Sequence, residues 1–237
     1  MNWDDYQAAL FDLDGVITPT AEVHMRAWRA MFTDFLATRQ GQAPYTDDDY
    51  FRYVDGKPRY DGVRSFLTAR GIELAPGSGA DETSLETVSG LGNLKDAMFG
   101  EVLEKDGVEA YPGSIALLDH LATLPVVLGV VSSSRNAPNV LAAAGLSDRF
   151  AFIVDGKVAG DAGLPGKPAP DTFLYAAHKA GATAATSVVI EDAVSGVAAG
   201  RAGEFALVIG VDRGAGADAL RAAGADLIVS DLEELIA

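Results

Sequence analysis

The hydrophobic positions of the chain gather in six short runs that are separated by polar or glycine-rich turns. The runs are residues 8–12 (AALFD), 126–132 (VVLGVVS), 151–155 (AFIVD), 187–192 (SVVIED), 205–211 (FALVIGV) and 226–231 (DLIVSD). Most are rich in β-branched residues, and they are nearly continuous rather than alternating, which is typical of strands buried on both faces of a parallel sheet. The pattern therefore predicts that these segments are strands.

Alanine- and leucine-rich segments with helical spacing lie between these runs. They cover residues 114–124, 137–146, 170–181, 193–203 and 217–225, and several of them end in glycine. Glycine is the residue that a helix prefers just beyond its C-terminus. Alternating strands and helices predict βαβ units, and hence an α/β fold with a doubly wound parallel sheet.

One long interval breaks this alternation. Residues 21–106 contain amphipathic helical patterns but no convincing strand, and they separate the first hydrophobic run from the second. This interval is far longer than a crossover helix needs. We therefore expect an all-helical domain, residues 18–107, inserted into an α/β core formed by residues 1–17 and 108–237, with the segment AYPGS at 110–114 as the return point.

Composition and charge narrow the classes of function. The chain is 49% hydrophobic, with 34 acidic residues against 18 lysines and arginines, a formal charge of −16. This balance argues against nucleic acid or an anionic membrane surface as a partner. The absence of cysteine excludes disulfides and thiolate metal sites. No apolar run is long enough to span a bilayer, and the N-terminus lacks a secretory pattern, which predicts a cytoplasmic protein.

Polar residues stand at four points where predicted strands end or helices begin. They are Asp12 with Asp14, the segment SSSRN at 132–136, Lys167 in GKPAP, and Glu191 with Asp192. In open parallel sheets, ligands bind at the carboxyl ends of the strands. We therefore expect these groups to form one site.

The residue types in this set suit phosphoryl transfer. A carboxylate nucleophile repels a phosphate, and Mg²⁺ resolves the conflict because it binds oxygen ligands and bridges carboxylate to phosphate. Asp12 and Asp192 are candidate ligands, Lys167 would neutralise further charge, and Ser132 would hold phosphate oxygens. Asp14 could protonate the leaving oxygen and deprotonate the incoming one, which is general acid–base work worth about 10²–10⁴-fold.

Each motif also has a plain structural interpretation. The pair Asp14-Gly15 is a common turn sequence, and Asp192 could cap the following helix. Lys167 could be solvated, and Asn136 could cap a helix that has Pro138 in its first turn. The four motifs in this order, all at strand ends, favour the catalytic interpretation.

Together the four motifs resemble those of the haloacid dehalogenase-like superfamily of phosphohydrolases. The resemblance implies that Asp12 becomes phosphorylated and that Asp14 is the acid/base. It also implies that Mg²⁺ is bound by the Asp12 carboxylate, the Asp14 backbone carbonyl and Asp192, with Glu191 supporting the metal shell.

The region after the first motif is similar to the β-phosphoglucomutase-like subgroup, whose members carry a helical cap there. The segments DGVIT and AEVHMRAW resemble its cap entrance, and KPAPDTF matches its third motif almost letter for letter. The resemblance implies that His24 links cap closure to proton transfer. It further implies that the following residues contact the substrate: Thr20, Trp28, Arg59, Lys95, Ser134, Arg135 and Asn136.

The basic residues of the inserted region have alternative explanations. Lys57 and Arg59 flank Pro58 at a predicted helix start, where the helix dipole disfavours cations unless an anion binds there; simple exposure is the other interpretation. Lys95 could snorkel from an apolar stripe, and His24 could be a packed core residue. Three positions depart from the subgroup pattern and bear on substrate choice: Pro19, Leu94 and Asp96, of which Asp96 could pair with Lys95.

Three functions remain open from the sequence. The first is a Mg²⁺-dependent enzyme that acts on sugar phosphates, either a mutase or a phosphatase of a small phosphorylated metabolite. The second is a haloacid dehalogenase, in which Asp12 attacks carbon without a metal. The third is a receiver-type module in which a phosphorylated aspartate is a signal. In each enzyme case the partner is a small molecule, and access through a cap favours a monomer.

Overall fold

The computed structural model describes residues 1–236, and the chain divides into two compact units. One unit contains Met1–Thr20 together with the chain from Val108 onward, and the other contains Ala21–Gly107. We call the first unit the core and the second the insertion.

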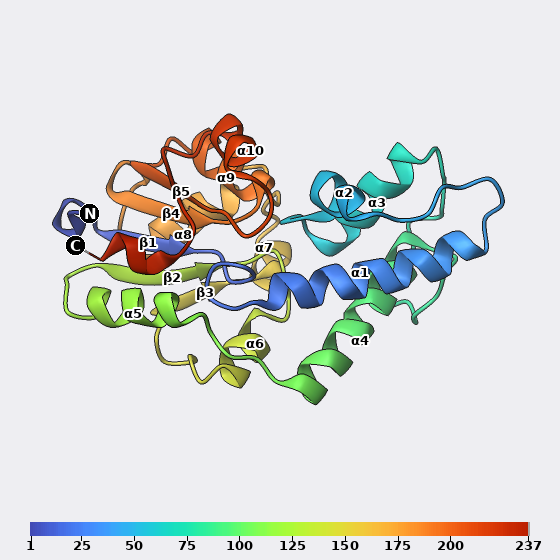
Figure 1. Cartoon of the computed structure of the whole chain (residues 1–237), viewed down its shortest axis with the longest axis horizontal. Coiled ribbons are helices and arrows are strands. Elements are labelled where there is room, and N and C mark those ends of the chain that lie inside the picture. Colours follow the sequence, from blue (N-terminus) through green and yellow to red (C-terminus); the bar gives the residue numbers. More distant parts are fainter. Residues whose placement is uncertain (237) are drawn as a thin grey trace. The chain divides into compact units, whose positions relative to one another are not determined.

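A six-stranded parallel sheet forms the centre of the core (Figure 1). Its strands are β1 (Ala8–Phe11), β2 (Val127–Val131), β3 (Phe152–Val154), β4 (Ser187–Glu191), β5 (Leu207–Val211) and β6 (Leu227–Val229), in the order β3-β2-β1-β4-β5-β6. All four residues of β1 are buried, as expected for the central strand. The predicted doubly wound α/β fold is confirmed, and each of the six hydrophobic runs contains one strand.

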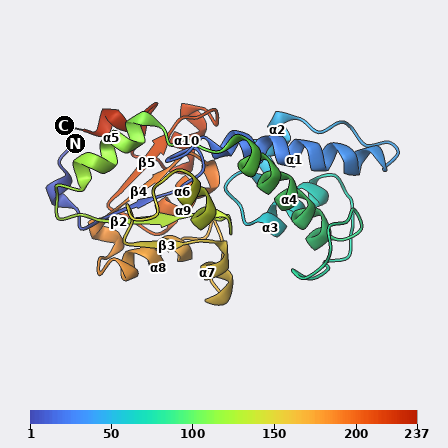
Figure 2. The same cartoon turned by 90° about the horizontal axis from the view of Figure 1, so that it is seen from below.

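Helices cover both faces of this sheet. They are α5 (Pro112–Leu121), α6 (Ala137–Ala143), α7 (Gly156–Asp161), α8 (Asp171–Lys179), α9 (Val194–Ala202) and α10 (Ala217–Ala223), with 3₁₀ turns η1 (Trp3–Asp5), η3 (Ala184–Thr186) and η4 (Leu232–Leu235). Figure 2 shows α5 and α8 on opposite sides of the sheet. Ala8 and Leu10 pack in one apolar cluster with Phe173 of α8 and Val197 of α9, so alternate residues of β1 serve the two faces.

The strand register brings the chemically interesting residues to one edge. Phe11, the last residue of β1, is paired with Val130 of β2 on one side and with Ile190 of β4 on the other. Asp12, Ser132 and Asp192 therefore follow three neighbouring strands at the same end of the sheet. This is the edge where open parallel sheets bind ligands.

Among the described residues of the insertion, the regular elements are helices, joined by loops that contain one isolated bridge between Ala75 and Thr87. The insertion contains most of α1 (Thr20–Ala37), then α2 (Asp47–Asp49), the π-helical turn η2 (Tyr50–Val54), α3 (Arg59–Ala69) and α4 (Val88–Asp106). Aromatic rings form its centre, and the ring centroids of Phe32 and Phe66 lie 3.9 Å apart. None of the helices within residues 1–236 has both the length and the apolar character required to cross a bilayer.

Candidate active site

Lys167 joins three strand ends through one ammonium group. Its Nζ donates hydrogen bonds to Asp12 Oδ1 at 2.5 Å, to Glu191 Oε1 at 2.5 Å and to the Val131 carbonyl at 3.0 Å. The backbone N–H of Asp12 donates to the Ile190 carbonyl at 2.9 Å, so the sheet itself fixes the base of that side chain. The Lys167 side chain is 1% exposed, so the carboxylates of Asp12 and Glu191, rather than solvent, stabilise its charge.

The buried charges of this site shift one another's protonation. Burial acts to lower the pKa of Lys167, but the attraction of Asp12 and Glu191 is stronger in sum and raises it well above its usual range. Burial raises the pKa of Asp12, opposed by Lys167 and reinforced by Glu191 and Asp14. One ammonium group thus does not balance the carboxylates gathered around it.

The same surplus of carboxylates fits a divalent metal ion. Oxygens of Asp12, Glu191 and Asp192 all lie within 4.8 Å of one another, and all three residues are buried. Hard cations such as Mg²⁺ bind oxygen ligands of this kind. A metal would also supply the positive charge that Lys167 alone leaves missing.

Both carboxylate oxygens of Glu191 accept hydrogen bonds from the protein. Oε1 accepts from Lys167, and Oε2 accepts from the Ala193 N–H at 3.0 Å. A β-carbon at position 196 would collide with this carboxylate, so Gly196 lets α9 approach it closely. Glu191 is therefore fixed by its own hydrogen bonds, and it orients Lys167.

Hydroxyl groups surround Asp14. The Thr20 Oγ1 donates to Asp14 Oδ1 at 2.5 Å, and the Ser132 Oγ donates to Asp14 Oδ2 at 3.4 Å. Thr20 Oγ1 is also 2.7 Å from Thr18 Oγ1. Thr20, expected to contact substrate, is bonded to the candidate acid/base in this structure. Sequence reasoning missed Thr18, although its place two residues before Thr20 on one turn was a usable signal.

The serine-rich segment after β2 folds into a tight loop. The Ser134 N–H donates to Ser132 Oγ, and the Asn136 N–H donates to Ser134 Oγ, each at 3.1 Å. Asn136 precedes α6 but makes no side-chain capping hydrogen bond. Arg135 is exposed, and its side chain lies beside Gly156 and Gly160 of α7. The loop thus presents Ser132 toward Asp14, while contact of Ser134, Arg135 and Asn136 with a substrate stays a prediction.

Within the insertion, His24, Trp28, Lys95 and Phe99 form what we call the His24–Lys95 cluster. Lys95 Nζ lies 2.5 Å from His24 Nδ1, and the His24 ring stacks on Phe99 with centroids 4.0 Å apart. The ammonium also lies over Trp28 at 5.3 Å and Phe99 at 5.1 Å from the ring centroids. Three of the predicted residues are therefore brought together, and the Phe99 ring lies against both His24 and Lys95.

Arg59 is the other basic candidate of the insertion. It is the first residue of α3, directly after Pro58, and its Nη1 lies 2.5 Å from Asp96 Oδ2. Arg59 and Asp96 meet where α3 and α4 approach closely at Gly92, since a β-carbon there would lie 2.7 Å from the Tyr60 ring. Lys57 donates to Ser65 Oγ at 2.9 Å, and burial lowers its pKa.

Comparison with known proteins agrees with this fold. The family model of haloacid dehalogenase-like hydrolases matches residues 6–204. The chain therefore belongs to the haloacid dehalogenase-like hydrolase family. Its 48% identity to a β-phosphoglucomutase of Mycobacterium bovis places it in the β-phosphoglucomutase-like subgroup.

Individual relatives span nearly the whole chain. A β-phosphoglucomutase of Mycobacterium bovis is 48% identical over 240 residues, covering 97% of this chain and 91% of the relative. Hexitol phosphatase A of Escherichia coli is 31% identical and covers 95% and 91%. The crystal structure of β-phosphoglucomutase from Clostridium difficile superimposes with a TM-score of 0.76 at 26% identity, covering 97% and 93%.

Proposed function

We propose that this protein is a Mg²⁺-dependent phosphoryl-transfer enzyme of the β-phosphoglucomutase type, acting on a sugar phosphate through an aspartyl-phosphate at Asp12. The observation that carries the proposal is the buried Lys167, bonded to Asp12 and Glu191 with Asp192 beside them. The 48% identity to a β-phosphoglucomutase supports the substrate class.

The first half-reaction uses the two aspartates of the first loop in different roles. An Asp12 carboxylate oxygen attacks the phosphorus, and the bond from phosphorus to the sugar oxygen breaks. Asp14 gives its proton to that leaving oxygen, which would otherwise depart as an unstable alkoxide. The hydroxyls of Thr20 and Ser132 hold the Asp14 carboxyl in place.

The second half-reaction returns the phosphoryl group to an acceptor. The acceptor hydroxyl loses its proton to Asp14 and attacks the phosphorus, and the bond to Asp12 breaks to restore the free carboxylate. Lys167 stabilises the charge on Asp12 throughout, at a site with little water. Mg²⁺, held by Asp12, Asp192 and the Asp14 carbonyl, would neutralise the phosphate oxygens as a Lewis acid.

The identity of the acceptor separates a mutase from a phosphatase. A mutase transfers to a second sugar hydroxyl and needs a contact for the phosphate that is not reacting; we assign Arg59 to that contact, with Lys95 as a second cation. A phosphatase transfers to water. The pairing of Arg59 with Asp96 and the 31% identity to a hexitol phosphatase favour the phosphatase as the second candidate.

One assay distinguishes the mutase from the phosphatase. The protein is incubated with β-glucose 1-phosphate, catalytic β-glucose 1,6-bisphosphate and Mg²⁺, and glucose 6-phosphate and inorganic phosphate are followed together. Isomer formation well ahead of phosphate release supports the mutase, and the reverse overturns it in favour of the phosphatase.

Asp12→Asn and a chelated sample are the controls. Either should abolish turnover of phosphate esters, because the nucleophile or the charge balance is lost. An Asp12→Asn protein that turns over these esters at the wild-type rate overturns the whole proposal. Release of halide from a haloacid in the presence of chelator, without turnover of phosphate esters, would instead support the metal-independent dehalogenase.

A further inference from the structure

Arg213, the second residue after β5, contacts several segments of the core with one guanidinium. Its Nε donates to the Gly15 carbonyl at 3.2 Å, its Nη1 to the Ser230 carbonyl at 2.8 Å, and its Nη2 lies 3.4 Å from Asp231 Oδ2. The guanidinium carbon lies 4.0 Å from the centroid of the Tyr111 ring. These four partners come from three separate regions of the sequence, so the side chain links them.

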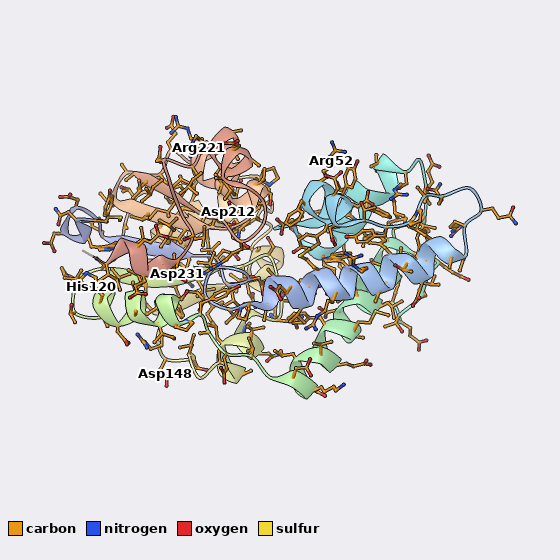
Figure 3. All side chains as sticks on the ribbon, in the orientation of Figure 1. Arg52, His120, Asp148, Asp212, Arg221 and Asp231 are labelled. Carbon is orange, nitrogen blue, oxygen red and sulfur yellow. The ribbon has the colours of Figure 1, made fainter. Side chains whose placement is uncertain are left out.

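The backbone that carries Arg213 is itself fixed. Asp212 donates its N–H to the Val229 carbonyl at 2.9 Å, and its Oδ1 accepts from the Gly214 and Gly216 N–H groups at 3.1 Å. Figure 3 labels Asp212 and Asp231, which follow β5 and β6. The guanidinium therefore projects from a rigid support.

Gly15 is the partner that matters chemically, because it follows the candidate acid/base Asp14. Its φ of +85° is a conformation that glycine adopts readily, and a β-carbon there would collide with the Asp192 carboxylate. Its N–H donates to the Thr18 carbonyl at 2.7 Å, which closes the turn. The position of the Gly15 peptide thus sets where Asp14 and Asp192 lie relative to one another.

The Tyr111 side of the contact supports the same turn. The Tyr111 N–H donates to the Ile17 carbonyl at 2.9 Å, and Ser114 Oγ donates to the Val16 carbonyl at 2.7 Å. A β-carbon at Gly113 would collide with Asp231, so the start of α5 packs against the residue that Arg213 also binds. Arg213 therefore supports the turn at residues 15–17 in two ways. It bonds the Gly15 carbonyl directly, and it stacks on Tyr111, whose segment bonds the carbonyls of Val16 and Ile17.

We propose that Arg213 is a positioning residue for proton transfer: it fixes the turn that follows Asp14 so that the Asp14 carboxyl meets the leaving oxygen. The inference rests on the proposed function of Asp14. An arginine is required because its planar fork donates to separate carbonyls while its face stacks on a ring, which a lysine ammonium does not reproduce. A displacement of the acid by about 1 Å costs on the order of 100-fold in rate.

The dependence of rate on the leaving group tests this role. A hexose phosphate has a poor leaving group and needs the acid, whereas p-nitrophenyl phosphate has a good one and needs it little. In Arg213→Gln, kcat/KM for the hexose phosphate should fall roughly 30-fold, and that for p-nitrophenyl phosphate by no more than about threefold, because only the acid is displaced. Arg213→Lys should recover part of the loss.

Two comparison variants make the result decisive. Arg221→Gln removes an exposed arginine of α10, labelled in Figure 3, that pairs with Asp218 at 3.0 Å, and it should change neither rate. Asp14→Asn should show the same selectivity for leaving group as Arg213→Gln. If Asp14→Asn shows none, the proposed function of Asp14 fails; if Asp14→Asn shows it and Arg213→Gln does not, only the inference about Arg213 fails.

Amide hydrogen exchange of the metal-free protein gives a readout that is independent of activity. The N–H groups of Gly15, Ile17 and Thr18 are bonded within the turn, and in Arg213→Gln they should exchange at least about tenfold faster while those of β1 stay unchanged. Uniformly faster exchange over the core, with both substrates equally impaired, would identify Arg213 as a purely structural residue and overturn the inference.

Discussion

The core and the insertion both hold buried or half-buried cations, but they hold them differently. Lys167 of the core lies between two carboxylates whose side chains are 10% and 0% exposed. In the insertion, Arg59 pairs with Asp96, whose side chain is 32% exposed, and Lys95 lies against an imidazole and two aromatic faces. Lys167 is thus paired with two well-buried carboxylates, whereas Arg59 pairs with a more exposed carboxylate and Lys95 lies against rings.

This difference matches the roles that we propose for the two units: phosphoryl transfer at Lys167 in the core, and substrate binding by Arg59 and Lys95 in the insertion. A group that takes part in bond breaking benefits from an environment that does not reorganise, and buried carboxylates around Lys167 provide it. A group that binds and releases a substrate must exchange partners, and a half-exposed ion pair or an aromatic face is readily exchanged because its net strength is small. The same substitution should therefore lower stability and activity more in the core than in the insertion.

The largest effect is expected from replacing each buried lysine by methionine. Lys167→Met leaves Asp12 and Glu191 facing one another without a cation, and we expect about 3–5 kcal/mol of lost stability and at least a 10³-fold lower kcat. Lys95→Met leaves an apolar stem on Trp28 and Phe99, and stability should change by less than about 1.5 kcal/mol. Denaturant unfolding and steady-state kinetics measure both; equal losses of stability would contradict the contrast.

A matched pair of glycine substitutions isolates the crowding at the core site. Gly15 and Gly41 have similar φ values, +85° and +79°, but a β-carbon at Gly15 would collide with Asp192 whereas nothing lies within 4 Å of one at Gly41. Gly41→Ala should cost only the backbone strain, about 1–2 kcal/mol, with unchanged activity. Gly15→Ala should cost more and lower kcat/KM on the order of 100-fold, because Asp14 and Asp192 are displaced.

Thermal unfolding measures the loss of stability in each variant, and steady-state kinetics measure the loss of activity. Together they separate backbone strain from the collision with Asp192. If both variants lose the same stability and keep wild-type rates, the close approach of Gly15 to Asp192 has no functional role.

The sequence was sufficient for the fold because strands buried on both faces are almost continuously apolar. Helix α7 was missed because six residues that begin with glycine show no helical period; its visible signal was Asp155, whose side chain caps it through the Lys157 and Val158 N–H groups. Short helices of this kind are defined by capping and tertiary packing rather than by pattern.

The sequence predicts more of the site's geometry in the core than in the insertion. Strand ends of a parallel sheet must meet, so Asp12, Ser132 and Asp192 could be placed together from their positions alone. The pairing of Arg59 with Asp96 could not be predicted in this way. It depends on how closely α3 and α4 approach at Gly92 and on the side-chain rotamers that this approach allows. The bond from Thr20 to Asp14 likewise depends on the turn at Gly15.

Addition of a metal should have a moderate effect that is confined to the core. Mg²⁺ at about 100 times its Kd should stabilise the wild type by about 2.7 kcal/mol and leave Asp192→Asn nearly unchanged. Burial raises the pKa of Asp12, so in the metal-free protein this carboxylate lowers stability as the pH rises above its unfolded value, and Mg²⁺ reverses that cost.

The same linkage fixes the sign of the pH dependence. Because the metal binds the deprotonated carboxylate, its stabilising effect should be lost as the pH falls through the raised pKa of Asp12. Melting temperatures at pH 8 and pH 5, with Mg²⁺ and with a chelator, measure it. A metal-induced shift that is larger at pH 5 would contradict the assignment of these ligands.

The smallest effect is expected at the Arg59–Asp96 pair, and it is a gain. Asp96 competes with a phosphate for Arg59, so Asp96→Asn should lower KM for the sugar phosphate by about two- to fivefold, the equivalent of a partly exposed ion pair, with kcat unchanged. Asp61→Asn is the matched control, because Asp61 pairs with Arg64 at 2.8 Å on the same helix as Arg59 and should leave KM unaltered. In an Arg59→Gln background, Asp96→Asn should have no such effect. A KM that rises, or that falls equally in both backgrounds, would mean that Arg59 does not bind the substrate phosphate and that its pair with Asp96 is structural only.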